Sequence, residues 1–265
     1  MSLPAPYYER DGIVLYCGDC LTLLPELPSG SVDFIFTDPP YGHNNNNGDL
    51  IANREKALGR GEAGAARPIA NDGEEANEIV RAAFGEWNRL LSHGGCCCCC
   101  CCCGGGGPDP QFARWSLWLD EAIGFKQMVV WDKGPMGMGW HYRRSYETVL
   151  VGEKPGAACR WFDETNKIEN IIRPYAHGIR KIVPQANEHP CAKPIELPMH
   201  FIRLHTQQGH LVLDPFMGHA PTAIACILLN RRFIGIELNE AYCAIAARRC
   251  EEAFDAQALY RQGTQ

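Results

Sequence analysis

Short, largely apolar runs alternate with amphipathic segments along most of the chain, and most runs end close to a glycine, an acid or a proline. Such runs are typical of strands buried on both faces, and they predict strands at residues 13–16, 32–37, 210–213 and 233–236. Apolar residues spaced three and four apart predict helices at residues 20–27, 75–91, 110–123, 198–206, 220–229 and 240–254. This alternation indicates an α/β fold with a doubly wound, mostly parallel, Rossmann-like sheet.

Two strand-like runs break the alternation. Residues 126–131 and 146–152 have no convincing helix between them, so we expect an antiparallel pair at one edge of the sheet. Two long polar segments also lack periodicity, and a connection of this kind is either functional or disordered. We expect residues 43–73 to form a mobile loop and residues 156–188 to form an insertion.

Eight of the fifteen cysteines are consecutive, at residues 96–103, with glycines on both sides. Zinc sites use cysteine pairs about two to four residues apart, which lets both thiolates reach one ion. Consecutive residues of a strand point to alternate faces, and free cysteine behaves as a small, commonly buried hydrophobic residue. The run therefore predicts a buried parallel strand, and no metal site is predicted.

The composition allows one substantial core. The chain has 265 residues, of which 46% are hydrophobic, so a single domain over residues 1–265 is expected. The net charge of −6 excludes a strongly basic nucleic-acid coat protein, and binding to nucleic acid would require a local basic surface. We find no signal peptide and no apolar run long enough to cross a bilayer, which predicts a cytoplasmic protein without a membrane partner.

The strand at residues 32–37 ends unusually, because "FIFTDPPYG" continues from apolar residues directly into an acid, two prolines and an aromatic ring. Ordinary turns use Gly or Asn instead. The prolines stiffen the backbone and remove two N–H donors, and the residue before a proline is held extended. Asp38 therefore points in a fixed direction, beside the carbonyls of Pro39 and Pro40 and the ring of Tyr41.

A βαβ unit is predicted over "HLVLDPFMGHAPTAIACILLNRRFIGIEL", where one strand ends at Asp214, a turn contains Gly218, and a second strand ends at Glu237. A glycine turn followed about twenty residues later by an acid is the arrangement of an adenosine-type cofactor site, although it also occurs for structural reasons. Ligands bind beyond the carboxyl ends of strands in open α/β sheets. We therefore expect Asp38 and Gly218 to flank one pocket.

In this order, the two motifs resemble the β class of S-adenosylmethionine-dependent DNA amino-methyltransferases, in which D-P-P-Y precedes an F-x-G-x-G cofactor motif. The resemblance covers most of the chain, including "GDCLTLLPELPSGSVDFIFTDPPYG", "RRSYETVLVGEK" and "HPCAKPIELPMHFIRLHTQQGHLVLDPFMG". It implies a methyltransferase that uses S-adenosylmethionine, acts on double-stranded DNA and forms a homodimer. Residues 43–73 and 156–188 would contact DNA, the second as a target-recognition insertion. The residues specify neither the recognition sequence nor a restriction endonuclease partner.

The resemblance also implies roles for the motif residues. The catalytic set would be Asp38, Pro39, Pro40 and Tyr41, in which Asp38 and the Pro39 carbonyl accept hydrogen bonds from the target amino group and Tyr41 stacks on the base. Asp19 would approach the adenine of the cofactor and Glu237 would bind its ribose. The complete cofactor set would be Asp19, Lys193, Asp214, Phe216, Met217, Gly218, His219, Thr222 and Glu237.

The chemistry accounts for the strand tip. An exocyclic amine is a poor nucleophile because its lone pair is delocalised into the ring, and acceptors held against its N–H bonds turn that lone pair toward the sulfonium methyl. A base inside a duplex must be flipped out to reach such a tip. D-P-P-Y resembles the N6-adenine enzymes more than the cytosine-N4 enzymes, whose motif often begins with Ser, so adenine is favoured and cytosine-N4 is the alternative.

The cofactor loop departs from the family's F-x-G-S-G-T-T pattern, since it reads Phe216-Met217-Gly218-His219-Ala220-Pro221-Thr222. Alanine replaces the second glycine and disfavours a positive φ, whereas Pro221 suits the first turn of a helix. A catalytically weak DNA-binding or regulatory protein on the same scaffold is therefore an alternative.

Two other kinds of methyltransferase are less favoured. A cytosine-C5 enzyme needs a nucleophilic cysteine after proline, and Pro190-Cys191 offers one, but this pair lies ahead of the cofactor strand and away from the D-P-P-Y tip. Methylation of RNA or of a protein amide shares the chemistry, and D-P-P-Y in this order favours DNA.

Overall fold

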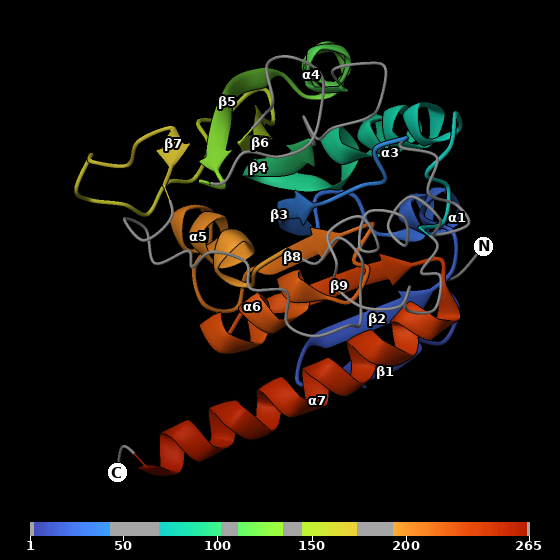
Figure 1. The fold of residues 1–265 in the computed structure, drawn as a ribbon, viewed down its shortest axis with the longest axis vertical. Coiled ribbons are helices and arrows are strands. Elements are labelled where there is room, and N and C mark those ends of the chain that lie inside the picture. Colours follow the sequence, from blue (N-terminus) through green and yellow to red (C-terminus); the bar gives the residue numbers. More distant parts are fainter. Residues whose placement is uncertain (1–2, 43–68, 102–110, 135–144, 174–192, 264–265) are drawn as a thin grey trace, which may run out of the picture.

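The computed structural model describes residues 3–42, 69–101, 111–134, 145–173 and 193–263. These residues form a nine-stranded sheet with helices on both faces (Figure 1). In their order across the sheet, the strands are β1 (Tyr8–Arg10), β2 (Ile13–Cys17), β9 (Arg232–Glu237), β8 (Leu211–Asp214), β3 (Val32–Thr37), β4 (Leu91–Cys101), β6 (Tyr146–Glu153), β5 (Phe125–Asp132) and β7 (Ile171–Ile172).

The centre of the sheet is parallel and its sides contain antiparallel pairs. Strands β2, β9, β8, β3 and β4 run in one direction, whereas β1 is antiparallel to β2 and β6 is antiparallel to both β4 and β5. The predicted α/β fold with a doubly wound, mostly parallel sheet is confirmed. The predicted antiparallel pair is β5 and β6, which lies beside the two-residue edge strand β7.

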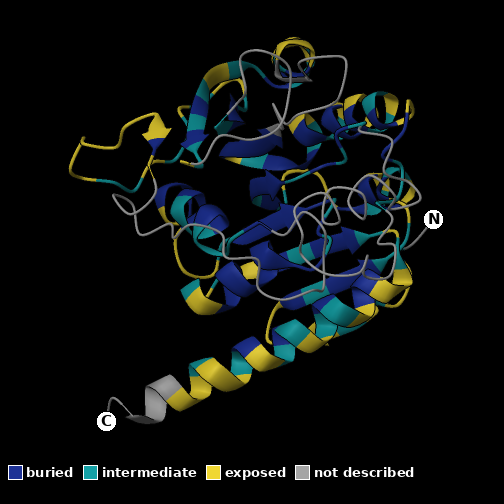
Figure 2. Ribbon diagram, viewed as in Figure 1, coloured by how far each residue is buried: buried dark blue, intermediate teal, exposed yellow. Residues whose placement is uncertain are grey.

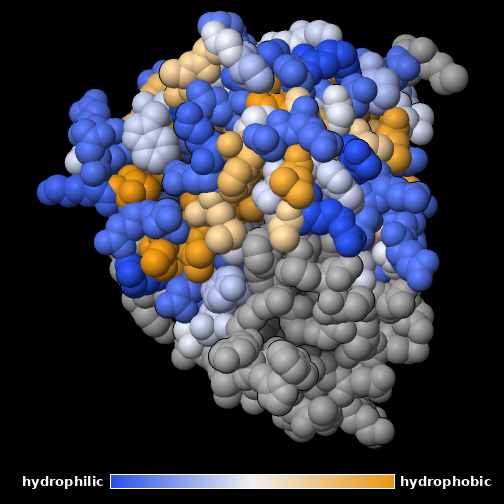
Figure 3. Space-filling view, turned by 90° about the horizontal axis from the view of Figure 1, so that it is seen from above, coloured by the Kyte–Doolittle hydropathy of each residue, from blue (hydrophilic) through white to orange (hydrophobic). Residues whose placement is uncertain are grey.

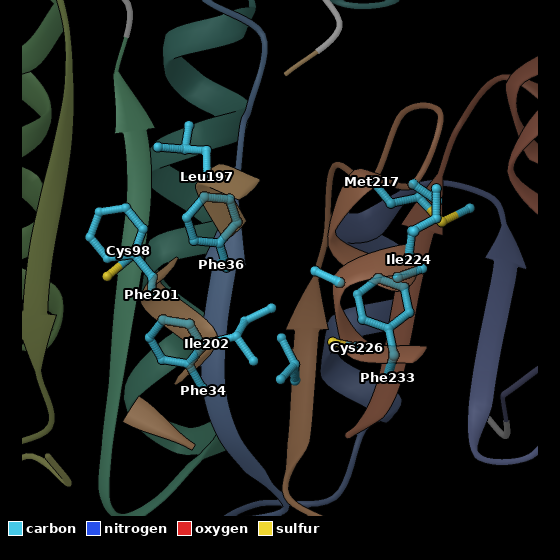
Figure 4. Close-up of a cluster of buried hydrophobic side chains, with 14 of the residues drawn as sticks. Phe34, Phe36, Cys98, Leu197, Phe201, Ile202, Met217, Ile224, Cys226 and Phe233 are labelled. Atoms are coloured by element: carbon cyan, nitrogen blue, oxygen red, sulfur yellow. The ribbon is translucent and has the colours of Figure 1, made fainter. Parts of the chain in front are cut away.

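The helices lie in two layers, and each layer covers one hydrophobic cluster. One layer contains α1 (Cys20–Leu23), the 3-10 helix η1 (Leu24–Glu26), α3 (Ala76–Leu90) and α4 (Gln111–Ala122). The other contains α5 (Glu196–His205), α6 (Pro221–Leu229) and α7 (Glu240–Gly263). Figure 4 shows Phe34 and Phe36 of β3 beside Phe201 and Ile202 of α5, and the ring centroids of Phe36 and Phe201 are 5.6 Å apart.

The consecutive cysteines form a buried strand, as predicted. Cys96 to Cys100 in β4 are buried; Cys96 to Cys99 pair with the parallel strand β3 on one side, and all five pair with the antiparallel strand β6 on the other. Their side chains alternate between the layers, because Cys96, Cys98 and Cys100 belong to one hydrophobic cluster and Cys97 and Cys99 to the other. Of the run, residues 102 and 103 lie outside the described residues.

Strands β8 and β9 position the functional residues. They lie between β2 and β3, so the last two strands of the chain separate its earlier ones. Phe34 pairs with Val212 and Ile35 with Leu213, which brings the carboxyl ends of β3 and β8 side by side. The Asp38 turn and the Gly218 turn therefore follow neighbouring strands, although they are far apart in the sequence.

Some elements differ from the sequence predictions. Strands β1 and β7 were not predicted, because they are very short and lie at the edges of the sheet, where a half-polar sequence is tolerated. Helix α7 continues well beyond residue 254, and its residues 255–259 are largely exposed (Figure 2). Apart from β7, residues 156–173 of the expected insertion are irregular, and residues 174–188 lie outside the described residues.

The described surface is mixed in character. Seen from above, hydrophilic side chains surround small groups of hydrophobic ones (Figure 3). Among the described residues, every helix is too short or too polar to cross a membrane.

Candidate functional site

One pocket lies beyond the carboxyl ends of β2, β3, β8 and β9, and all thirteen predicted catalytic and cofactor residues line it. Asp38 and Gly218 therefore flank one pocket, as expected for two tips at the same edge of a parallel sheet. Further lining residues were not predicted; among them are Cys20, Phe36, Asp72, Ile79, Leu238 and Tyr242. Most of these are apolar, and a single apolar residue in a strand or helix gives no signal of its own.

The carboxylate of Asp38 is held from two sides. Tyr41 Oη donates a hydrogen bond to Asp38 Oδ1, and the Lys193 ammonium lies 3.0 Å from Asp38 Oδ2. Lys193 Nζ also donates to Tyr41 Oη at 3.0 Å, which closes a triangle of polar groups. The pKa of Asp38 is raised because burial disfavours the charged form more than Lys193 stabilises it. Such a carboxylate is fixed in direction and ready to accept a proton.

A second carboxylate, Glu147 of β6, shares the same lysine. Lys193 Nζ lies 3.1 Å from Glu147 Oε2, and Lys133 bonds to the other oxygen. Burial alone would raise the pKa of Glu147, but Lys193 and Lys133 lower it to about 2, so Glu147 is charged. The sequence analysis assigned no role to Glu147. An acid inside the otherwise apolar run "YETVLV" was the available signal.

Lys193 was predicted to contact the cofactor. The structure directs its ammonium at Asp38, Tyr41 and Glu147, and its side chain is only 6% exposed. One ammonium between two carboxylates forms a buried charge network, in which the lysine contacts the D-P-P-Y segment through Asp38 and Tyr41.

The turn after β3 is fixed by Asp72, which lies at the end of the segment expected to be a mobile loop. Asp72 Oδ1 accepts hydrogen bonds from the backbone N–H groups of Tyr41, at 3.0 Å, and Gly42, at 2.8 Å. Asp72 is buried. Residues 43–68 of the expected loop lie outside the described residues. The D-P-P-Y turn, which comes just before residues 43–73, is therefore held by Asp72, which lies near the end of these residues.

Asp214 fastens the two tips to each other. Its carboxylate accepts hydrogen bonds from Thr37 Oγ1 and Thr222 Oγ1, both at 2.7 Å, and from Phe216 N at 3.1 Å. Thr37 immediately precedes Asp38, so the bond between Thr37 and Asp214 joins the end of β3 to the end of β8. Burial raises the pKa of Asp214 to about 7 in spite of these three donors.

Glu237 and Asp19 lie on the cofactor side of the pocket. Glu237 Oε2 accepts from Gly218 N at 3.0 Å and Oε1 accepts from Asn239 N at 2.8 Å, while burial raises the pKa of the carboxyl group. Asp19 caps α1, because its Oδ1 accepts from Leu21 N at 3.0 Å. Glu237 therefore holds the backbone of the glycine turn, and Asp19 fixes the start of α1, directly after β2.

The other predicted residues of the cofactor loop form its wall. Phe216 is half-buried, whereas Met217 and His219 are buried. Met217 packs on Gly235 of β9, where an added Cβ would lie 2.5 Å from the Met217 sulfur. Arg249 of α7 donates to the His219 carbonyl at 2.7 Å. The loop is thus held by side chains and backbone from two neighbouring elements.

Ala220 adopts the left-handed conformation predicted to be unfavourable for it, with φ +62° and ψ +45°. A non-glycine residue in this region carries strain. We expect Ala220→Gly to raise the free energy of unfolding by about 0.5–1 kcal/mol, measured by denaturant titration. The matched control is Ala223→Gly in α6, where glycine should lower stability by about 1 kcal/mol. A loss of stability in Ala220→Gly would contradict the assignment of strain to this residue.

Pro190 and Cys191, the pair that a cytosine-C5 mechanism would use, lie outside the described residues. The described part of the pocket includes Cys20, which is buried and whose pKa is raised to about 12 by burial. A thiol of this kind is a poor nucleophile, because the thiolate is the reactive form.

Comparison with known proteins gives consistent results. Residues 32–248 match the DNA methylase family of N6 and N4 methyltransferases. The chain is similar to the Type II methyltransferase M2.DpnII of Streptococcus pneumoniae, with 26% identity over 93% of this chain and 92% of that protein. It is also similar to the DNA adenine methyltransferase YhdJ of Escherichia coli K12, with 25% identity over 89% of this chain and 82% of that protein. The structure of the cytosine-N4-specific PvuII DNA methyltransferase shares the fold, with a TM-score of 0.67, 18% identity, and coverage of 95% of this chain and 94% of that one.

Proposed function

The chain belongs to the DNA methylase family, and on that basis we propose that it transfers a methyl group from S-adenosylmethionine to the N6 amino group of adenine in double-stranded DNA. The observation that carries the proposal is the position of the Asp38 carboxylate, which lines the same pocket as the Gly218 turn and Glu237. The acceptor for a substrate amine and the elements of a nucleoside site thus lie within one cavity.

The residues on the Gly218 side fit S-adenosylmethionine. The backbone N–H groups of Gly218, Asn239 and Leu238 hydrogen-bond to the Glu237 carboxylate, which has about four acceptor sites and so retains capacity for a ribose hydroxyl. This hydroxyl would also compensate for the burial that raises the pKa of Glu237. Phe216 and Leu238 give the pocket apolar walls. When bound, the cofactor supplies a methyl group on a positively charged sulfur.

Asp38 and the Pro39 carbonyl are proposed to accept the two N–H bonds of the target amine, which directs its lone pair toward the methyl group. The nitrogen must lose one proton after it is methylated. Asp38 is proposed to hold this proton, and its raised pKa supports that role. Lys193 and Tyr41 keep the carboxylate in place while the amine binds.

Tyr41 is proposed to contribute through its ring as well as its hydroxyl. In the structure the residue is 9% exposed, its hydroxyl bonds to Asp38, and Lys193 Nζ lies 5.1 Å from the ring centroid. Stacking on an extruded base therefore requires part of the ring to become accessible when DNA binds. The hydroxyl contact with Asp38 supports a positioning role that needs no such movement.

Adenine is favoured over cytosine-N4 because Asp38, and not serine, stands first in the motif, and because one similar protein is named a DNA adenine methyltransferase. We expect DNA from cells that express the protein to contain N6-methyladenine in one sequence context, detected by mass spectrometry of nucleosides and by methylation-sensitive long-read sequencing. Cells that express Asp38→Ala are the control. N4-methylcytosine instead would establish the alternative, and unmodified DNA together with intact cofactor binding would establish a regulatory protein.

The partners are also proposals. Residues 43–73 and 156–188 are proposed to contact duplex DNA, and the protein is proposed to act as a homodimer in the cytoplasm within a restriction–modification system, as the Type II names of its relatives suggest. A monomer in light scattering, both with and without DNA, would contradict the dimer.

A further inference from the structure

Two cysteines and a histidine converge at a position away from the pocket. Cys96 belongs to β4, Cys159 follows β6, and His205 is the last residue of α5. Their two sulfur atoms and one histidine nitrogen all lie within 4.8 Å of one another. Cys96 pairs with Phe34, near the amino end of β3, whereas Asp38 follows the carboxyl end of that strand. The cluster is therefore separate from the chemistry proposed above.

The distances within the cluster are those of ligands around one ion. His205 Nδ1 lies 3.2 Å from Cys96 Sγ and 3.4 Å from Cys159 Sγ. In a tetrahedral zinc site, bonds of about 2.3 Å to sulfur and about 2.0–2.1 Å to nitrogen put these ligand atoms roughly 3.5 Å apart. The carbonyl oxygen of Arg160 is a further polar atom on this side, 3.1 Å from Nδ1.

The surroundings also suit a metal ligand set. The His205 ring stacks on Phe34 at a centroid distance of 5.2 Å and meets the edge of Trp161 at 5.2 Å, so its orientation is fixed. Cys96 and His205 are buried, while Cys159 is half-buried and gives access from solvent.

We propose that Cys96, Cys159 and His205 supply three ligands to one Zn²⁺ ion, whose fourth position is open to solvent on the side of the half-buried Cys159. Two thiolates neutralise the charge of the ion, and sulfur with imidazole is the donor set that zinc prefers. Binding converts two thiols and one ion into a neutral complex and releases two protons, so affinity rises with pH. The ion joins β4, α5 and the beginning of residues 156–188, where Cys159 lies. Its ligands are 46 and 109 positions from His205, which is why local cysteine spacing did not predict the site.

The test uses the full-length protein, reduced and stripped of metal with a chelator. Zn²⁺ is titrated in competition with a chromophoric chelator, and Co²⁺ is used to detect the thiolate-to-metal charge-transfer band. One tight Zn²⁺ per chain and a higher thermal midpoint with zinc are expected for the wild type. Cys159→Ser and His205→Gln should each weaken zinc binding by at least about 100-fold, whereas the control Cys250→Ser, a buried cysteine of α7, should bind zinc as the wild type does.

Several outcomes would overturn the proposal. If Cys159→Ser and His205→Gln bind zinc as tightly as the wild type, the ion is held by other residues and the proposal is wrong. A wild-type chain that binds no zinc after reduction would also overturn it, as would a Cys96–Cys159 disulfide in a protein that gains no stability from zinc when reduced. The zinc titration does not depend on the proposed reaction, because it does not measure methyl transfer. Methyl transfer by Cys159→Ser at low temperature should equal that of the wild type.

Discussion

Asp38→Ala is expected to slow methyl transfer by at least about 100-fold, the effect of losing one preorganised polar contact in a transition state. The fold and cofactor binding should remain nearly intact, because Glu237 and the Gly218 turn bond to each other and not to Asp38, and Lys193 keeps Glu147 as its partner. The measurements are single-turnover transfer of labelled methyl groups to duplex DNA and calorimetric binding of the cofactor.

Three further variants refine this result. Asp38→Asn keeps one carbonyl acceptor and should lose less activity than Asp38→Ala. Tyr41→Phe keeps the ring but removes the hydroxyl that bonds to Asp38, so any loss reports on positioning, whereas Tyr41→Ala also removes a stacking surface worth roughly 1–3 kcal/mol. Transfer by Asp38→Ala at the wild-type rate would refute the catalytic role of this residue.

Lys193→Met is expected to lower the free energy of unfolding by about 3–5 kcal/mol, the usual cost of breaking a buried ion pair by removing one partner. The variant leaves Glu147 with Lys133 alone and Asp38 without its cation, and both the Lys193 and Glu147 side chains are at most 10% exposed. Denaturant titration measures the loss. The double variant Lys193→Met/Glu147→Gln should recover part of it, because the second change removes a buried charge. A single variant as stable as the wild type would contradict the proposed network.

The same variant distinguishes a role at Asp38 from a role at the cofactor. Loss of the ammonium should raise the pKa of Asp38 further, so the carboxylate forms only at higher pH. The acidic limb of the methyl-transfer profile should therefore move to higher pH, while cofactor affinity changes little. Weaker cofactor binding with an unchanged acidic limb would instead support the contact that the sequence resemblance implied for Lys193.

Local patterns predicted most strands and helices, because a continuous apolar run indicates a buried strand and apolar residues three or four positions apart indicate a helix. They also located both tips, since Asp38-Pro39-Pro40-Tyr41 and the Gly218 turn are contiguous motifs. The partners of these motifs were not predictable. Glu147 reaches Lys193, and Asp72 reaches the Tyr41 turn, only through the packing of separate strands and segments.

The roles within the pocket depended on tertiary structure for the same reason. Asp214 was expected beside the cofactor, and the structure directs its carboxylate to Thr37 and Thr222. The histidine that meets Cys96 and Cys159 lies at the end of another helix. A sequence shows that an acid ends a strand, but the partner of that acid is fixed by which strand lies next to it.

The order of the strands has a consequence for synthesis of the protein on the ribosome. Strands β2 and β3 are made early, but their neighbours β9 and β8 lie in the last fifth or so of the chain. Because domains fold as units during synthesis, the sheet forms only after this last part has emerged. Until then the apolar edges of β2 and β3 lack their native partners and are open to wrong pairing. Chains that end before residue 211 lack β8 and β9 and therefore cannot complete the sheet, so they should be substrates for chaperones and proteases. The D-P-P-Y turn is made early, and the Gly218 turn that shares its pocket is made only when synthesis is almost complete.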